Sequence, residues 1–181
     1  MKRSLFLLIT MLCLGTTMVR AQLLAVKTDA LMDVMMIPNL NAELVVGERS
    51  SVNASVFGSY KMYGKNFKTL GLMPEYRFWF NGRPMTREFV GLAVIGVNYD
   101  LTWGKEVYEG NALGAGLTFG YSFNLSSHWN LECYGSVGAI YYDQKRYYEG
   151  DREDYLGNKH NSRGYSVIPF KLGVSFSYII K

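Results

Sequence analysis

The sequence predicts an all-β fold, namely an eight-stranded antiparallel up-and-down β-barrel of the transmembrane type. Eight segments alternate between apolar and small or polar side chains with the period of two that a β-strand requires. Residues 112–123 show the pattern best, because Leu, Phe and Tyr occupy one face while Gly, Thr and Ser occupy the other. A bulky apolar face opposite a face of small residues is typical of a strand with lipid outside and a crowded polar lumen inside.

Residues 1–21 have the features of a cleaved signal peptide. Two basic residues precede an apolar run over residues 5–14, and small residues stand at the first and third positions before Gln22. We expect export, cleavage before Gln22 and a single mature domain over residues 22–181. No later run of about 18 apolar residues offers a helical membrane span.

Removal of the signal changes the charge and the cysteine content. It contains Lys2, Arg3 and Arg20 and no acidic residue, so the formal charge falls from +4 by three to +1, which argues against nucleic-acid binding. Cys133 is then the single remaining cysteine, so no internal disulfide is expected. Cys13 lacks the adjacent small residue of a lipoprotein signal, which argues against lipidation.

The alternating segments have lengths that suit tilted strands, since about 9 to 11 residues cross a bilayer. The fifth segment is the weakest, because apolar Val90, Leu92 and Val94 share the face assigned to the lumen with Asn98. The predicted strands cover residues 24–32, 39–46, 51–63, 70–80, 88–100, 111–123, 130–142 and 168–180. Their lumen-facing side chains are assigned by parity as Lys27 and Asp29, then Asn41 and Glu43, then Asn53, Ser55, Ser59 and Lys61, then Glu75 and Arg77, then Val90, Leu92, Val94 and Asn98, then Thr118 and Ser122, then Glu132, Tyr134 and Ser136, and last Lys171, Ser175 and Ser177.

The links between these strands alternate in length. Those after the second, fourth and sixth strands are short to moderate, whereas those after the fifth and seventh are long, the longest covering residues 143–167. Barrels of this type have short periplasmic turns and longer outer loops, with both termini on the periplasmic side. We therefore expect residues 143–167 to lie outside the cell.

Aromatic side chains gather near the strand ends on the face assigned to lipid. Two such girdles are typical of the two membrane interfaces, whereas a general preference of aromatics for strands predicts no clustering. One rim receives Tyr76, Phe78, Phe80, Phe89, Phe123 and Tyr178, and the other receives Tyr60, Tyr99 and Tyr141.

The lumen-facing charges are of both signs and are expected to pair. An eight-stranded barrel is just wide enough for side chains to fill, which favours a structural plug over an ion path or proton relay. Glycines at 114, 116, 120, 138 and 173 leave room for long side chains. The predicted network comprises Lys27, Asp29, Glu43, Glu75, Arg77, Glu132 and Lys171.

Several short motifs resemble those of an uncharacterised outer-membrane family of the Bacteroidetes. They are Lys-Thr-Asp at 27–29, Pro-Asn-Leu at 38–40, Pro-Glu-Tyr-Arg-Phe-Trp at 74–79 and Trp-Asn-Leu-Glu at 129–132. The resemblance spans nearly all of the mature chain, although Lys181 stands where an aromatic usually ends an outer-membrane assembly signal. Members are described only as a domain of unknown function, and some are encoded near fimbrial genes. The resemblance therefore implies no activity but an association with fimbriae, while the architecture resembles the small OmpA-domain and OmpX-type barrels.

Motifs for catalysis are scarce. The chain has two histidines, His128 and His160, in separate links, too few for a metal centre, and no cofactor is expected. Ser127 beside His128 is similar to the serine and histidine of outer-membrane lipid hydrolases, but both are also ordinary turn residues. The 143–167 loop offers a candidate recognition surface, with a merely solvated loop as the alternative. That surface consists of Tyr147, Tyr148, Arg152, Tyr155 and Tyr165.

Together these features predict a small monomeric outer-membrane protein that is not an enzyme. We expect it to contact outer-membrane lipids and to act through its outer loops in a structural, adhesion or surface-recognition role, with a surface or fimbrial protein as partner. One alternative is a soluble lipocalin-like carrier of a small ligand, which would require an apolar lumen. The other alternative is a lipid-modifying enzyme of the outer membrane.

Overall fold

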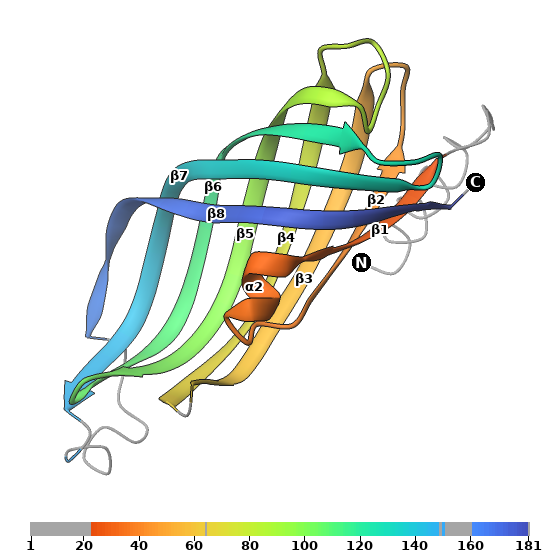
Figure 1. The fold of residues 1–181 in the computed structure, drawn as a ribbon. Helices are drawn as coiled ribbons and strands as arrows, with labels where there is room; N and C mark the ends of the chain where they lie inside the picture. Colours follow the sequence, from red (N-terminus) through yellow and green to blue (C-terminus); the bar gives the residue numbers. More distant parts are fainter. Residues whose placement is uncertain (1–22, 64, 149, 151–160, 181) are drawn as a thin grey trace, which may run out of the picture.

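Eight antiparallel strands close into a barrel in which each strand pairs with its neighbours in sequence and β8 returns to β1 (Figure 1). The computed structural model describes residues 23–63, 65–148, 150 and 161–180, so the signal-peptide prediction lies outside its described part. The predicted eight-stranded up-and-down architecture is confirmed. The elements are β1 (Leu24–Asp29), α2 (Ala30–Val34), β2 (Asn39–Val45), β3 (Ser50–Met62), β4 (Lys65–Trp79), β5 (Arg87–Trp103), β6 (Glu106–Asn124), β7 (Trp129–Tyr148) and β8 (Ser162–Ile180).

The barrel has two unlike ends. At the termini end, β1 begins and β8 ends, beside the links from β2 to β3, β4 to β5 and β6 to β7. At the opposite hairpin end lie α2 and the outer ends of β3 to β8. The wall is uneven, because β1 and β2 have 6 and 7 residues whereas β5 to β8 have 17 to 20. Figure 1 shows the longer strands extending well past α2.

Two strand boundaries differ from the prediction. The first strand stops at Asp29, because its carboxylate accepts a 3.0 Å hydrogen bond from the Met32 N–H and thereby caps α2. No helix among the described residues is long and apolar enough to cross a membrane. The long link predicted after the fifth strand is instead strand on both sides of a tight turn, in which Gly104 has a φ of +68°.

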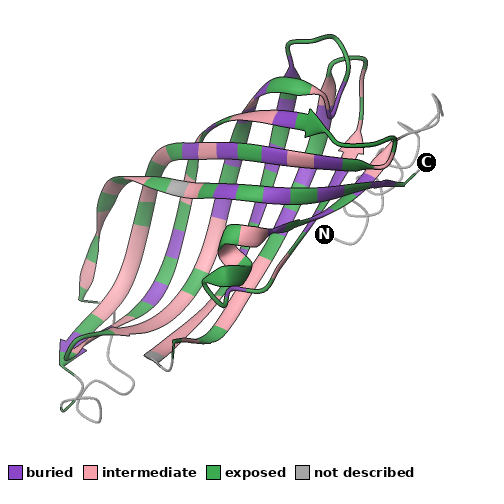
Figure 2. Ribbon diagram, in the orientation of Figure 1, coloured by how far each residue is buried: buried purple, intermediate pink, exposed green. Residues whose placement is uncertain are grey.

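The alternation of side chains is confirmed in seven of the eight strands over most of their length. Figure 2 shows buried and exposed residues in turn along the strands in the half of the barrel nearer the termini, and more intermediate residues toward the other end. In β6, Leu113 and Leu117 are exposed while Thr118 and Ser122 are almost fully buried. The buried face points into the barrel, because it carries the polar and charged side chains that bond to one another across the lumen.

The prediction for the fifth strand is wrong in its facing. Leu92 and Val94 are exposed, while Phe89 is buried inside the barrel, so Val90, Leu92 and Val94 do not line the lumen. The hydroxyl of Tyr99 bonds inward to Gln144, so neither Phe89 nor Tyr99 belongs to an outer girdle. Alternation could not decide this strand because both of its faces are apolar; packing against other strands decides it.

A β-bulge in β8 changes the facing of its outer half. Ser136 pairs with Lys171 but Val137 pairs with Pro169, so one extra residue stands between them. Pro169 has no N–H to donate, which suits a break in the ladder. Leu172 is exposed as predicted, whereas Ile168, predicted to face outward, lines the inside of the barrel.

The packing around Gly120 yields a stability prediction. A Cβ on Gly120 would lie 2.5 Å from the Phe89 ring, whereas one on Gly135 would meet nothing closer than 3.7 Å. We expect Gly120→Ala to lower the free energy of unfolding by about 1 to 3 kcal/mol through overpacking, and Gly135→Ala to leave it unchanged or raise it. Urea unfolding of refolded protein in detergent micelles measures both. Equal effects would contradict the packing of Phe89 against β6.

Candidate functional site

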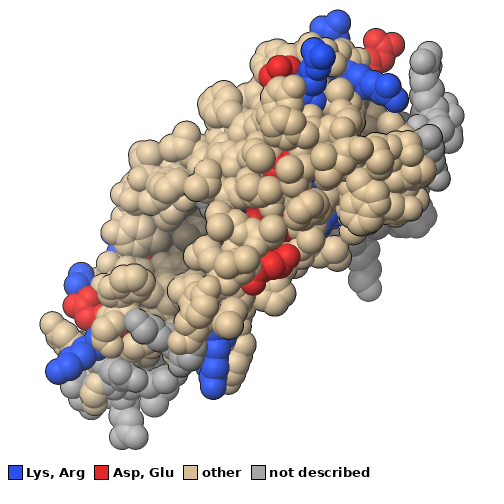
Figure 3. Space-filling view, viewed as in Figure 1, with Lys and Arg blue, Asp and Glu red and all other residues tan. Residues whose placement is uncertain are grey.

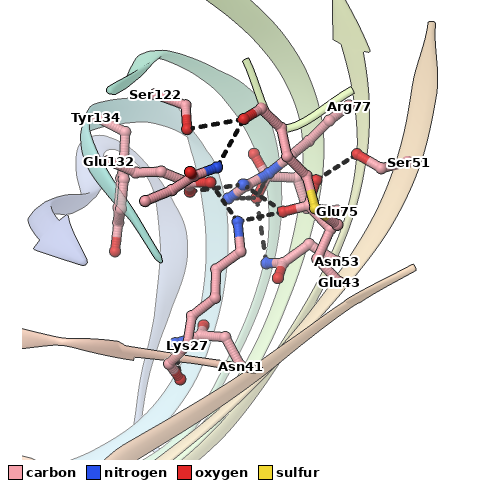
Figure 4. A network of polar contacts seen from close by, with 12 residues as sticks. Lys27, Asn41, Glu43, Ser51, Asn53, Glu75, Arg77, Ser122, Glu132 and Tyr134 are labelled. Carbon is pink, nitrogen blue, oxygen red and sulfur yellow. Dashed lines mark hydrogen bonds and ion pairs between the residues drawn. The ribbon is translucent and has the colours of Figure 1, made fainter. Parts of the chain in front are cut away.

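Five charged side chains meet in the lumen near the termini end (Figure 4). The guanidinium of Arg77 lies 2.9 Å from a carboxylate oxygen of Glu43, 2.9 Å from one of Glu75 and 3.0 Å from one of Glu132. Lys27 forms ion pairs with Glu43 and Glu132. A closed ring of ion pairs therefore runs through Lys27, Glu43, Arg77 and Glu132. Glu75 also lies in the lumen and contacts Arg77 from outside this ring. We call these five residues the ionic ring.

Neutral groups hold the ionic ring in place. Ser51 donates a hydrogen bond to Glu43 and accepts one of 2.8 Å from the indole Nε1 of Trp79. The Phe89 ring lies 4.5 Å from the guanidinium carbon of Arg77, a cation–π contact. All five ring members are at most 2% exposed, so each charge needs the partners that it has.

An apolar floor closes the lumen between the ionic ring and the termini end. The link between β4 and β5 folds under the barrel, and the Met85 carbonyl accepts hydrogen bonds from Asn130 (2.7 Å) and Ser122 (3.2 Å). The floor packs together Ala25, Trp79, Met85, Phe89 and Ile179 from five parts of the chain, and Tyr134 of β7 belongs to the same apolar cluster. The sequence did not predict this floor, because residues 80–86 have the composition of an ordinary turn. Only the structure shows that Met85 in this link is buried.

Asp29 and Lys171 do not join the ionic ring, although they were predicted to. Asp29 accepts a hydrogen bond from the Tyr134 hydroxyl. Lys171 lies 3.4 Å from the Asn41 amide oxygen and 4.7 Å from the centre of the Tyr134 ring, and no carboxylate of a described residue lies within 4 Å of its ammonium. Gly173 makes room for this layer, since a Cβ there would lie 2.0 Å from Asp29 Oδ2. Of the seven residues in the predicted network, five form the ionic ring. The other two, Asp29 and Lys171, lie in an adjacent layer.

The hairpin half of the lumen is hollow and apolar. A cavity of about 560 Å³ is lined by β4 to β8, and a smaller one of about 190 Å³ reaches from it toward Lys171. Phe67 and Thr69 line both, so the two cavities are neighbours. We call the larger one the chamber. Its apolar walls include Phe67, Val97, Leu101, Ala112, Ile140 and Ile168, and the lining side chains with a polar group include Thr69, Tyr99, Tyr108, Tyr142, Gln144 and Ser166.

The chain has relatives among known protein families and solved structures. A family model described as a protein of unknown function (DUF3575) matches residues 7–180. The chain belongs to this family. Among solved structures, it is similar to Neisserial surface protein A (NspA), with 14% identity, a TM-score of 0.41, and coverage of 87% of this chain and 94% of that one. No curated protein matches the chain.

Three of the five residues of the predicted recognition surface, namely Tyr147, Tyr148 and Tyr165, lie in the described part of the chain. Tyr147 is buried, so it is not part of an exposed surface. Tyr165 is exposed on the outer wall of β8 with its ring 5.1 Å from that of Tyr141, and Tyr148 is exposed at the end of β7. Arg152 and Tyr155 lie outside the described residues.

The predicted chemical groups are placed as follows. Ser127 Oγ lies 2.9 Å from His128 Nδ1 in an exposed turn at the termini end, far along the barrel from the chamber. Within the described part of the chain, no group of three or more His, Cys, Asp or Glu side chains could hold a metal ion. His160 is not among the described residues.

The ionic ring predicts the effect of removing its centre. Arg77→Met leaves three buried carboxylates with Lys27 alone, so we expect the free energy of unfolding to fall by roughly 3 to 5 kcal/mol. Lys171→Met, which breaks no carboxylate pair, should cost about 1 kcal/mol. Urea unfolding with far-UV circular dichroism compares the two. An equal loss in both variants would show that Arg77 does not hold the lumen together.

Proposed function

We propose that this protein is a small outer-membrane β-barrel, closed to ions, whose hairpin end serves a structural, adhesion or surface-recognition role. The observation that carries the proposal is the apolar belt around its outer wall. Soluble monomers rarely expose apolar patches of more than a few hundred Å². Here large apolar side chains are exposed on every strand, among them Val26, Leu40, Val56, Leu72, Leu92, Leu113, Val137 and Leu172.

The distribution of charged and aromatic side chains supports a membrane location for this belt. In Figure 3, Lys and Arg gather at the two ends, and the band between them is mostly uncharged, with acidic atoms near α2 and a few more charged atoms visible between the tan ones. Asp33 of α2 is held by hydrogen bonds from Thr28 (2.6 Å) and Asn39 (2.9 Å). Without Phe89 and Tyr99, exposed aromatic side chains still lie at both rims. They are Tyr76, Phe78, Phe80, Phe123, Trp129 and Tyr178 at the termini end, and Tyr60, Tyr141 and Tyr165 at the hairpin end.

The filled termini half of the lumen supports a plug over an ion path. Every member of the ionic ring is engaged by an opposite charge, and the apolar floor lies directly beneath it. An ion crossing this region would have to displace Arg77 from its carboxylates and then pass Trp79 and Met85. Both steps are unfavourable in a region of low dielectric constant.

The hairpin end offers the surface for a non-enzymatic role. Arg146 of β7 lies 2.8 Å from Glu106 of β6, and this hydrogen bond, with a further one from Tyr108, lowers the pKa of Glu106. These contacts stiffen the outer part of the β6–β7 pair. Exposed Trp103 and Tyr148 stand beside it, and aromatic side chains of this kind are enriched at protein interfaces. A surface or fimbrial protein is the partner that we propose for a monomeric barrel.

The alternatives fit less well. A soluble carrier would have to expose the apolar belt to water, although the chamber does supply the apolar lumen that such a carrier needs. A lipid-modifying enzyme would have to use Ser127 and His128, which lie in the turn at the end opposite the chamber.

Burial of the belt in a bilayer predicts a depth-dependent cost of charge. Leu117 lies in the middle of the belt on β6, and Leu125 is an exposed leucine beyond the termini-end girdle. Leu117→Arg should impair folding into lipid vesicles by about 2 to 4 kcal/mol, whereas Leu125→Arg should cost about 0 to 1 kcal/mol. Heat-modifiable migration in detergent electrophoresis reports the folded fraction. Similar folding of the two variants would argue against a transmembrane belt.

A closed lumen also predicts electrical silence. Refolded wild-type protein inserted in a planar bilayer should give no steady single-channel conductance, because the ionic ring and the floor fill the passage. Insertion is confirmed separately by protection of the barrel from protease in vesicles. A stable open channel of the wild type would refute the plug and favour the ion path.

A further inference from the structure

The wall of the barrel is incomplete on one side of its hairpin half. β8 pairs with β1 only over Ser175–Ile180, because β1 ends at Asp29, and β3 pairs with β2 only from Ser51 to Phe57. The outer parts of β8 and β3 therefore have no strand between them. β1 and β2 are also shorter than the roughly 9 to 11 residues that cross a bilayer as strand.

The segment that follows β1 covers only part of this gap. The Tyr63 hydroxyl donates to the Val34 carbonyl (2.6 Å) and the Ser59 hydroxyl to the Met36 carbonyl (2.9 Å), so the α2 segment is tied to β3. On the other side, Leu31 of α2 lies beside Leu172, near the middle of β8. The part of β8 from Ser162 to Ile168 extends beyond α2, and Figure 3 shows the molecule hollowed between them.

The chamber lies behind this opening, and its inner end, at Ala112, Ile140 and Ile168, is level with the outer rim of the apolar belt at Tyr141 and Tyr165. Its lining residues Ala112 and Ile168 alternate with exposed Leu113 and Val167 on the outer wall. The chamber therefore opens sideways toward whatever surrounds the belt. Its volume of about 560 Å³ is within the range of small-molecule sites, roughly 300 to 1,000 Å³.

We propose that the chamber binds one acyl chain of a membrane lipid, which enters sideways through the opening between β8 and α2. This inference rests on the proposed outer-membrane location. Water is a poor occupant of the inner end, because the side chains of Val97, Ala112, Ile140 and Ile168 offer it no hydrogen-bond partner. Lipid chains are the molecules nearest to the opening, and filling the void restores dispersion contacts that an empty cavity loses.

The polar residues of the chamber favour one orientation of the lipid. Gln144 lies toward the hairpin end, where its amide oxygen accepts the Tyr99 hydroxyl at 2.7 Å. Its Nε2 has no hydrogen-bond partner among the described residues and can donate to an ester carbonyl. The ester then lies near the interface, and the chain runs inward past Phe67 toward the smaller cavity.

Photocrosslinking in vesicles tests the proposal. The protein is refolded into phosphatidylcholine vesicles that contain a phosphatidylcholine with a diazirine midway along one chain, and crosslinked residues are located by mass spectrometry. We expect adducts on chamber residues such as Phe67, Ile140 and Ile168 as well as on belt residues such as Leu113. Ala112→Phe, which fills the chamber, should abolish the chamber adducts and keep the belt adducts. Ala115→Phe, on the outer face of the same strand, should keep both.

The outcomes separate this inference from the proposed function. Belt adducts without chamber adducts in the wild type would overturn the chain site and leave the membrane location standing. Chamber adducts that persist in Ala112→Phe would also overturn it, because the chain would then not occupy the chamber. Absence of all adducts from folded protein would overturn both the inference and the membrane location.

Discussion

The lumen of this barrel depends on Arg77. One guanidinium contacts Glu43, Glu75 and Glu132 from three different strands, which its planar set of five N–H donors allows and an ammonium would not. Lys27 then closes the ring, so that strands β1, β2, β4 and β7 are linked across the interior. In a barrel too narrow for much water, these charges are stable only together, because each would be costly alone.

The position of the ring divides the lumen into two unlike halves. On one side, the link between β4 and β5 brings Met85 beneath the ring and completes an apolar floor with Trp79 and Phe89. On the other side, Asp29, Tyr134 and Lys171 form a layer of weaker contacts, and beyond it the side chains no longer meet across the barrel. The lumen is therefore filled and charged toward the termini end, and it is hollow and apolar toward the hairpin end.

Much of this arrangement could be predicted from the sequence, and the failures have physical causes. Alternation identified all eight strands and all five members of the ionic ring. A charged side chain that alternates along a strand with lipid-facing side chains must point into the lumen. It could not orient the fifth strand, where Phe89 and Leu92 are equally apolar and only packing under Arg77 decides. It could not detect the β8 bulge, which reverses Ile168, since a single inserted residue leaves the composition unchanged. The floor and the chamber depend on contacts between distant segments, and local patterns do not encode these.

Asp29 connects the two halves of the molecule. One oxygen of its carboxylate caps α2 and so ends β1 after six residues, while the other accepts the Tyr134 hydroxyl inside the lumen. Its backbone N–H bonds to the Asn39 side chain, which begins β2 at the same level. A longer β1 and β2 would have closed the wall opposite β8 and sealed the chamber from the belt. The same residue that anchors the layer above the ionic ring therefore sets where the wall ends, so the side opening arises from one local choice of helix over strand.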